Sequence, residues 1–303
     1  MLRGLEMRGK SWDAFRRSMV RYCRACADLL LPRKCLACGR RLLLDEDFIC
    51  LGCRTDMPLT RFWERSHNPM ADRFNALLQG HLEDEWLQET IIPDGFEGIE
   101  DRVHERYAYA CALFFYSTEA GYRKIPYSIK YEGNIPAGKH FGKMLGKRLS
   151  ESVWFSDVDM VIPVPLHWKR KWKRGYNQAE IIAGALAHEL GAALRTDILR
   201  RTRNTVSQTR LDIREKARNV AGAFEVPEQF ARLVCSADKD AVLNCSDAEA
   251  SSSSGTNMPR HILLVDDTFT SGSTLLACFT ALRAVFPPSS VRISVVTLAF
   301  VGH

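Results

Sequence analysis

The sequence contains no long hydrophobic run. Hydrophobic side chains make up 46% of its 303 residues, but the longest apolar runs are far shorter than the roughly 20 residues that cross a bilayer. No N-terminal stretch combines basic residues with an apolar run, so we expect no signal peptide and no membrane insertion. Six of the ten cysteines lie in C-x-x-C pairs within the first 53 residues. We therefore expect a cytoplasmic protein, because in that reducing compartment such pairs hold metal more often than they form disulfides.

Positive charge is in small excess, and the formal net charge is +6. Residues 1–61 are basic, whereas residues 62–101 hold ten carboxylates and only two arginines. Further basic clusters lie at 169–174 and 195–218. Clustered Lys and Arg suit an anionic ligand, either a phosphorylated small molecule or a nucleic acid. For any single cluster, a solvated surface explains the charge equally well.

Apolar patterning divides the chain into three parts. Residues 1–61 predict a helix and a turn-rich cysteine module, 62–105 an acidic linker or insertion, and 106–303 an α/β domain. In the last part strands alternate with amphipathic helices, which indicates a parallel sheet with flanking helices. The Ser-rich segment 236–259 predicts a disordered loop. We expect strands over 107–116, 160–164, 223–226, 261–265 and 291–299, and helices over 119–131, 136–150, 178–190 and 272–285.

A helix is predicted ahead of Pro32, which would end it. Two cysteines fall on the apolar face of this helix. For these two, buried structural cysteines are favoured over metal ligands. The apolar face comprises Trp12, Phe15, Met19, Cys23, Cys26 and Leu30.

Four further cysteines have the spacing of a metal site. They form a C-x2-C-x11-C-x2-C pattern, and four thiolates on two short chelate loops suit tetrahedral Zn²⁺. Gly39 and Gly52 relieve the tight turns around the sulfurs. We therefore predict a structural zinc ribbon. Its ligands are Cys35, Cys38, Cys50 and Cys53.

An acidic pair and a hydroxyl-rich loop follow the apolar strand 262–265. The loop leads into a helix, and a turn at a helix N-terminus cradles phosphate with backbone N–H groups and the positive end of the helix dipole. Gly272 lets the backbone approach the anion closely. The acids Asp266 and Asp267 repel phosphate but accept hydrogen bonds from a sugar diol, so the motif predicts a ribose 5-phosphate site. The loop residues are Thr268, Thr270, Ser271, Gly272, Ser273 and Thr274.

Other interpretations of acidic strand ends are weaker here. An acidic strand end without a ligand occurs in Walker B strands and receiver domains. A Walker B strand needs a P-loop, and residues 4–11 do match that pattern. Because only three residues precede this match, it lacks the buried strand that a P-loop requires. We reject it.

Two basic stretches also point to anions. After the strand 160–164, the stretch 168–174 suits pyrophosphate, a solvated patch, or a nucleic acid stacked on Trp168 and Trp172. On residue type alone the three interpretations are nearly equal. The polar stretch 200–212 suits a lid over the reacting centre or an exposed amphipathic helix.

Four motifs in order, over residues 107–303, resemble the ComF family of competence-associated phosphoribosyltransferase-like proteins. The motifs are SIKYEG from Ser128, IPVPLHWKRKWKRGYNQAEIIA from Ile162, RTRNTVSQTRLDIREKARNVAGAF from Arg201 and ILLVDDTFTSGSTL from Ile262. Members of this family often begin with a helix, a proline and a zinc ribbon, so the resemblance extends to the N-terminal module. It implies a type I phosphoribosyltransferase-like fold.

The resemblance also implies roles for individual residues. VDDTFTSGSTL resembles the loop that binds phosphoribosyl pyrophosphate (PRPP), so Asp266 and Asp267 would hold the ribose hydroxyls and act as the catalytic candidates. The loop 268–274 would bind the 5-phosphate. Arg174, in the loop 165–177, would face pyrophosphate, and Lys130 is a candidate phosphate contact.

Two hypotheses of function follow. In the first, the protein is a PRPP-dependent pentosyltransferase, in which Mg²⁺ holds the leaving pyrophosphate and no protein nucleophile is needed. No acceptor pocket is recognisable in the sequence. In the second, it is an inactive accessory protein of DNA uptake that uses its basic loops and zinc module to bind single-stranded DNA or a helicase.

Overall fold

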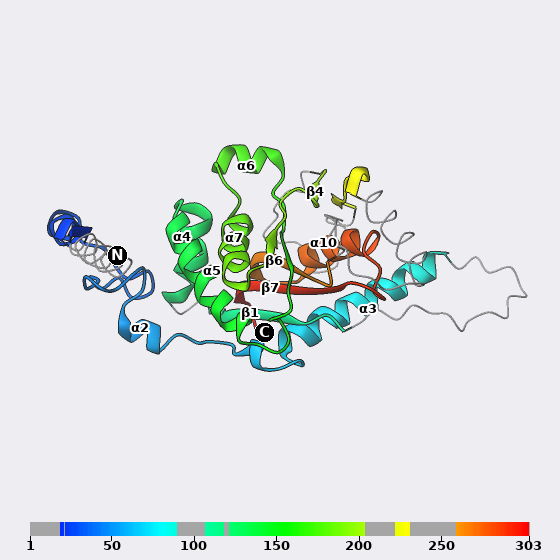
Figure 1. Ribbon diagram of the computed structural model, residues 1–303, viewed down its shortest axis with the longest axis horizontal. Coiled ribbons are helices and arrows are strands. Elements are labelled where there is room, and N and C mark those ends of the chain that lie inside the picture. The colour runs from blue at the N-terminus through cyan, green and yellow to red at the C-terminus, as the bar shows by residue number, and fades with distance from the viewer. Residues whose placement is uncertain are drawn as a thin grey trace, which may run out of the picture.

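The computed structural model describes residues 19–20, 22–89, 107–117, 121–203, 222–230 and 259–302. At its centre is a five-stranded sheet in the order β1-β7-β6-β2-β3, in which all neighbouring strands are parallel. Figure 1 shows helices on both faces of this sheet. The predicted α/β fold is therefore confirmed. The strands are β1 (Ala110–Phe115), β2 (Met160–Pro163), β3 (Ala193–Leu194), β6 (His261–Phe269) and β7 (Arg292–Phe300).

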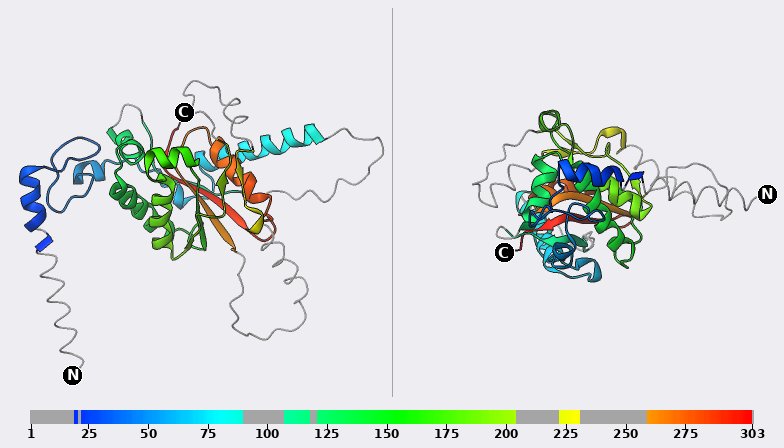
Figure 2. Two further views of the ribbon diagram at one scale, coloured as in Figure 1. Left: turned by 90° about the horizontal axis from the view of Figure 1, so that it is seen from above. Right: turned by 90° about the vertical axis from the view of Figure 1, so that its left-hand side faces the viewer.

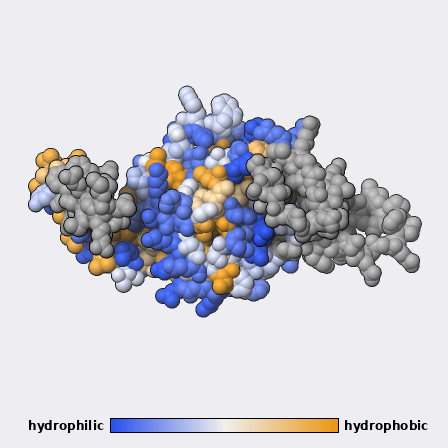
Figure 3. Space-filling model, viewed as in Figure 1, coloured by the Kyte–Doolittle hydropathy of each residue, from blue (hydrophilic) through white to orange (hydrophobic). Residues whose placement is uncertain are grey.

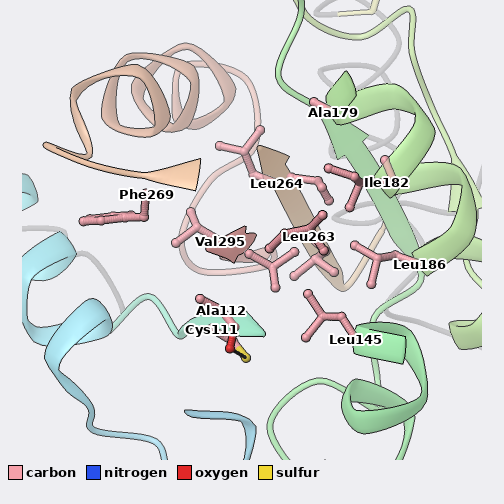
Figure 4. Packing of buried hydrophobic residues seen from close by; sticks show 14 of the residues in the cluster. Cys111, Ala112, Leu145, Ala179, Ile182, Leu186, Leu263, Leu264, Phe269 and Val295 are labelled. Carbon is pink, nitrogen blue, oxygen red and sulfur yellow. Dashed lines mark hydrogen bonds between the residues drawn. The ribbon is translucent and has the colours of Figure 1, made fainter. Parts of the chain in front are cut away.

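The central strands are buried on both faces, as expected for a parallel sheet. In β7 every residue after Arg292 is buried. Figure 4 shows Leu145, Ile182 and Leu186 packed on one side of Leu263. The helices on that side are α4 (Lys124–Tyr131), α5 (Ile135–Ser150) and α7 (Gln178–Leu190), whereas α3 (Pro69–Glu89) and α10 (Ser273–Arg283) lie on the other.

The ends of α7 follow from its sequence. Asn177 is the N-cap, and its side-chain oxygen accepts a hydrogen bond from the Ala179 backbone N–H. Gly191 ends the helix in the left-handed conformation, with φ of 66°, which glycine adopts without a steric penalty. These caps fix the first residue of α7, and that residue lies in the candidate site described below.

Helix α3 corrects part of the interpretation of residues 62–105. Instead of a linker, residues 69–89 form a 21-residue helix. Met70, Ala71 and Phe74 are fully buried, and the Asn75 side chain bonds the backbone of Ala108 just before β1. The buried positions lie on one side of α3, but polar and acidic residues keep its mean hydropathy low and further apolar residues lie off this side, so the sequence pattern misses the helix.

The N-terminal module lies at one end of the α/β domain (Figure 2). Residues 22–30 are helical and stop just before Pro32, as predicted. Cys23 and Cys26, however, are exposed, so the prediction that they are buried is wrong. The helix attaches to the module through its charged side, where Arg24 contacts Asp47. The short helices α2 (Leu51–Thr55) and η1 (Phe62–Glu64) connect the module to α3.

The module also contacts the α/β domain directly. The short helix η2 (Gly121–Arg123) comes immediately before α4. The Tyr122 hydroxyl donates to the backbone oxygen of Cys53 at 2.9 Å. A Cβ atom at Gly121 would lie 2.1 Å from the backbone oxygen of Ala37, so only glycine permits this approach. The cysteine module is thus fitted against the start of α4.

Several predicted segments fall outside the described residues. They are the P-loop-like match at 4–11, the first part of the N-terminal helix at 12–18, and most of the expected loop at 236–259. Most of the stretch 200–212 lies outside as well, although its first residues form β4 (Arg200–Arg201), which pairs antiparallel with β5 (Phe224–Glu225). Among the helices that the structure describes, none has the length and apolar character of a membrane span.

Candidate functional site

The acidic pair lies within strand β6. The sequence predicts that the strand ends at residue 265, but it continues to Phe269 because β7 pairs with it along its whole length, including Asp266 opposite Thr297. Strand β2 stops at Pro163, whose partner is Val265. Beyond that point, among the residues that the structure describes, no strand pairs with this edge of β6, which leaves room at the carboxyl end of the sheet for side chains and a ligand.

Two side chains that are distant in the sequence contact the second carboxylate, that of Asp267. The Asp267 side chain is buried, with its Oδ2 atom 3.5 Å from Lys130 Nζ and 3.3 Å from Gln178 Nε2. The positive charge of Lys130 comes from α4, and the amide of Gln178 comes from the first turn of α7. The adjacent Asp267 also raises the pKa of Lys130. Lys130, which the resemblance gives as a candidate phosphate contact, therefore contacts one of the acids, while Gln178 is a site residue that the sequence analysis misses.

The first carboxylate has an unusual environment. Burial, with the nearby negative charge of Asp267 as a second cause, raises the pKa of Asp266 to about 7. Its Oδ1 atom accepts a hydrogen bond from the Asp267 backbone N–H at 2.8 Å. A carboxyl group that titrates near neutral pH can accept or release a proton when a polar ligand approaches.

The loop after β6 forms a cradle at the start of α10. Gly272 is the N-cap of α10 with φ of 82° and makes no side-chain cap, while the Ser273 N–H donates a long hydrogen bond of 3.5 Å to Ser271 Oγ. The start of the helix therefore presents backbone N–H groups of the kind that bind anions. The Ser271 and Ser273 hydroxyls lie 3.0 Å apart and border the same space. The hollow, of about 220 Å³, is lined by Asp266, Thr268, Phe269, Thr270, Ser271, Gly272, Ser273, Thr274 and Leu275.

Helix α3 supports this cradle from behind. A Cβ atom at Gly272 would lie 2.8 Å from Leu77 Cδ1 and 2.8 Å from Phe269 Cζ. The Arg73 guanidinium lies 5.8 Å from the Phe269 ring centroid. The loop is therefore packed closely against a helix from the acidic segment, a contact that no local sequence pattern predicts.

The first basic stretch forms a short helix, α6 (Trp168–Arg174), in the connection between β2 and α7. Asn177 anchors this connection by donating to the Val164 backbone oxygen at 3.0 Å, and the Tyr176 hydroxyl donates to the backbone oxygen of Ile129 on α4. The Arg174 guanidinium lies 5.7 Å from the Tyr131 ring centroid. Arg174 is thus held over α4 next to Lys130.

The outer part of α6 has a different character. Trp168 and Trp172 are 66% and 86% exposed, and they are four positions apart, so they lie on one side of the helix. Lys169 Nζ lies 5.4 Å from the Trp168 ring. This part of the basic stretch carries stackable rings among cations and faces away from the protein core.

The second basic stretch contributes Arg201. Burial lowers its pKa, and among the nearby charges Asp266 acts in the opposite direction. Its guanidinium lies 5.1 Å from the Phe224 ring on β5. Strand β4 therefore places a cation close to the acidic pair.

The four ribbon cysteines meet as predicted. Their Sγ atoms all lie within 4.8 Å of one another, and the Cys38 and Cys50 sulfurs are 3.8 Å apart, the separation expected when four thiolates bind one Zn²⁺ at about 2.3 Å. The Cys53 backbone N–H donates to Cys50 Sγ and is the main cause that lowers the pKa of Cys50 to about 6. The donor set fits a tetrahedral zinc ion, with all four sulfurs as ligands.

The fold and site together define an α/β protein with an acidic pair and a glycine- and hydroxyl-rich loop at the carboxyl end of its sheet, joined to a four-cysteine module. The chain is 38% identical over 78 residues to the DNA utilization protein YhgH of Salmonella typhi, covering 25% of this chain and 34% of that protein. It is 30% identical over 118 residues to competence protein F of Haemophilus influenzae, covering 39% and 41%.

A further relative is the DNA utilization protein YhgH of Escherichia coli O157:H7, with 30% identity over 119 residues and coverage of 39% of this chain and 40% of that protein. The matches span 34% to 41% of the length of these relatives. No family model matches the chain. The chain is thus similar to these relatives over less than half of its own length and less than half of theirs.

Proposed function

We propose that the chain binds PRPP or a related ribose 5-phosphate at the end of β6. The observation that carries this proposal is the meeting of the acidic pair with Lys130 and Gln178 beside a glycine-centred cradle. Carboxylates accept hydrogen bonds from a sugar diol, and the cradle N–H groups suit a phosphate. One ligand that carries both groups is a ribose 5-phosphate.

Each part of the site has a role in this proposal. Asp266 and Asp267 accept hydrogen bonds from the ribose hydroxyls, and the loop 270–274 binds the 5-phosphate. Lys130 and Arg174 neutralise the pyrophosphate. The carboxylate oxygens of the acidic pair are ligands of the kind that Mg²⁺ takes, and Mg²⁺ bound with PRPP would withdraw charge from the leaving pyrophosphate.

We propose pentosyl transfer as the reaction class. The bond between the anomeric carbon and pyrophosphate breaks, and an acceptor forms a new bond to that carbon. Positioning and charge neutralisation supply most of the catalysis in such a reaction. The names of the relatives, competence protein F and DNA utilization protein, support a role of this site in DNA uptake or utilization.

Titration of the full chain with PRPP and Mg²⁺ in a calorimeter tests the proposal. We expect saturable heat at ligand concentrations below about 1 mM, corresponding to more than about 4 kcal/mol of binding free energy. A Gly272→Val variant should bind at least about tenfold more weakly, because its Cβ would meet Leu77 and Phe269 at a residue with φ of 82°. Gly80→Val on α3, whose Cβ would meet no atom within 4 Å, is the matched control. Absence of heat from the unmodified chain at millimolar PRPP would refute the proposal.

A second candidate function rests on α6. Its exposed Trp168 and Trp172 beside five basic residues suit single-stranded DNA, because bases stack on aromatic rings while cations neutralise phosphates. This binding does not require the acidic pair.

Trp172→Ala is expected to weaken binding of a fluorescent oligothymidylate by about 1 to 3 kcal/mol, the usual contribution of one stacked base. Affinity should also fall steeply as salt rises. Leu44→Ala, which removes an exposed apolar side chain from the cysteine module, is the control. Equal DNA affinity in the Trp172 variant and the control would eliminate α6 as the binding element.

A further inference from the structure

The helix at residues 22–30 turns its charged side toward its own protein. Arg24 contacts Asp47, and Asp28 binds Arg33 with 2.8 Å between Oδ2 and Nη2. The backbone oxygen of Asp28 also accepts a hydrogen bond from Arg41 at 2.8 Å. These contacts fix the helix on the cysteine module and determine which side faces outward.

The outward side is apolar and contains both thiols of the remaining C-x-x-C pair. Met19 and Leu30 are 50% and 85% exposed, and Cys23 and Cys26 are both exposed. In helical geometry, Arg24 and Asp28 point away from this stripe. Figure 3 shows hydrophobic residues at the edge of the molecule where Figure 1 places the N-terminal helix. A helix that pairs its charges internally and exposes its apolar stripe is the reverse of an ordinary surface helix, which indicates that another surface covers the stripe.

The spacing of the stripe indicates what covers it. Met19, Cys23, Cys26 and Leu30 are separated by four, three and four positions, the alternation with which one helix packs along another in a coiled coil. The flanking Tyr22 and Leu29 are also exposed and widen the contact. The stripe therefore fits a helix as its partner.

The two thiols make the choice of partner more specific. Two cysteines three positions apart lie on one side of a helix and can share one metal ion, but tetrahedral Zn²⁺ takes four ligands. Among the described residues, the four-ligand cluster is that of the ribbon, and Cys23 and Cys26 are not part of it. A second copy of the same helix, related by a two-fold axis, supplies the two missing thiolates and covers the apolar stripe at the same time.

We propose that this chain forms a symmetric dimer through the helix at residues 22–30, in which Cys23 and Cys26 of both copies bind one shared Zn²⁺. The apolar residues of the stripe pack across the two-fold axis, and the metal joins the two helices at the centre. The ribbon zinc of each copy is separate from this ion.

Sedimentation and metal analysis of the full chain, purified with a non-thiol reductant, test the proposal. We expect a dimer with about 1.5 zinc ions per chain, one in the ribbon and half of the shared ion.

Cys23→Ser with Cys26→Ser should reduce zinc to about one per chain and raise the dimer dissociation constant about tenfold or more. Leu30→Glu should give a monomer, because two buried carboxylates would meet at the interface. Val153→Glu, at an exposed apolar residue outside this helix, should leave both measurements unchanged.

Other occupants of the stripe give different results. A monomer with one zinc per chain overturns the proposal, and a monomer that co-sediments with anionic phosphatidylglycerol vesicles assigns the stripe to a membrane surface. A dimer that forms only when the reductant is omitted, with one zinc per chain, indicates a disulfide link and overturns the shared metal. A dimer unaffected by Leu30→Glu places the interface elsewhere.

Discussion

Replacing Asp266 and Asp267 together with asparagine is expected to abolish detectable binding of PRPP. Asparagine preserves the volume of each side chain but removes its charge, so the diol loses two charged acceptors. Lys130, 3.5 Å from Asp267 Oδ2, also loses its partner. With about 1.5 to 3 kcal/mol for each hydrogen bond to a charged group, affinity should fall at least about a hundredfold. Calorimetric titration with PRPP and Mg²⁺ measures the change.

The controls for this experiment separate binding from folding. Asp56→Asn removes one carboxylate from an exposed position far along the chain and should leave affinity unchanged. A thermal melt shows whether the double variant is folded. An undiminished heat of binding in a folded double variant would show that the ligand binds elsewhere.

The pH dependence of binding provides a further check on Asp266. Burial and the neighbouring Asp267 raise its pKa to about 7, so it loses its charge as the pH falls through neutrality. Because the ligand requires the charged acceptor, PRPP affinity should fall as the pH decreases below about 7. In Asp266→Asn this dependence should largely disappear, whereas a dependence that persists unchanged would assign it to another group.

Cys35→Ser combined with Cys50→Ser is expected to remove the ribbon zinc and unfold the cysteine module. Both side chains are buried, next to the small apolar group of Leu42 and Ile49. So few apolar residues cannot stabilise a module of this size, and a structural zinc site contributes on the order of 10 kcal/mol in small domains. Metal analysis should show one fewer zinc ion per chain, and limited proteolysis should produce new cleavage within residues 33–61.

A matched variant distinguishes the ribbon from other thiols. Cys23→Ser with Cys26→Ser also removes two cysteines of the N-terminal region, but it should retain the ribbon zinc and the original proteolysis pattern within residues 33–61. If the ribbon variant kept its zinc and its resistance to cleavage, the four-sulfur cluster would not be the metal site.

The elements with strong local signals were predictable from the sequence. Helix α7 has an apolar face, an asparagine N-cap and a glycine at its end, and the structure has it at Gln178–Leu190 as expected. Strand β2 is a short apolar run with a proline at its end. In these elements periodicity and capping favour the same conformation, and the tertiary contacts of the folded protein do not change it.

Other elements depended on contacts that a local pattern does not contain. Strand β6 extends through its two acids because β7 pairs with it, although charged residues are depleted in strands. In the N-terminal helix, the apolar face was identified correctly, but its burial was not. Periodicity shows which side of a helix is apolar, and only the ion pairs of Arg24 and Asp28 determine which side faces the protein.

Some residues of the candidate site were likewise predictable from the sequence, and others were not. The acidic pair and the cradle are contiguous in the chain, so the sequence predicts them together. Gln178 lies 89 positions before Asp267, and a glutamine at the start of a helix has no pattern that assigns it to a site. Leu77 supports Gly272 from the acidic segment, where the sequence suggested a linker or insertion.

The contact between the cysteine module and η2 connects the four-cysteine cluster with the candidate site at the end of β6. Cys53, one of the four clustered cysteines, accepts a hydrogen bond from the Tyr122 hydroxyl through its backbone oxygen, and η2 leads directly into α4, which carries Lys130. If zinc binding steadies α4, it lowers the cost of ordering Lys130 around a sugar phosphate. Linkage is reciprocal, so a bound sugar phosphate would then raise the affinity for zinc by the same factor, and a chelator at a fixed concentration would remove less zinc at equilibrium. Each ligand would thus report on the occupancy of the other.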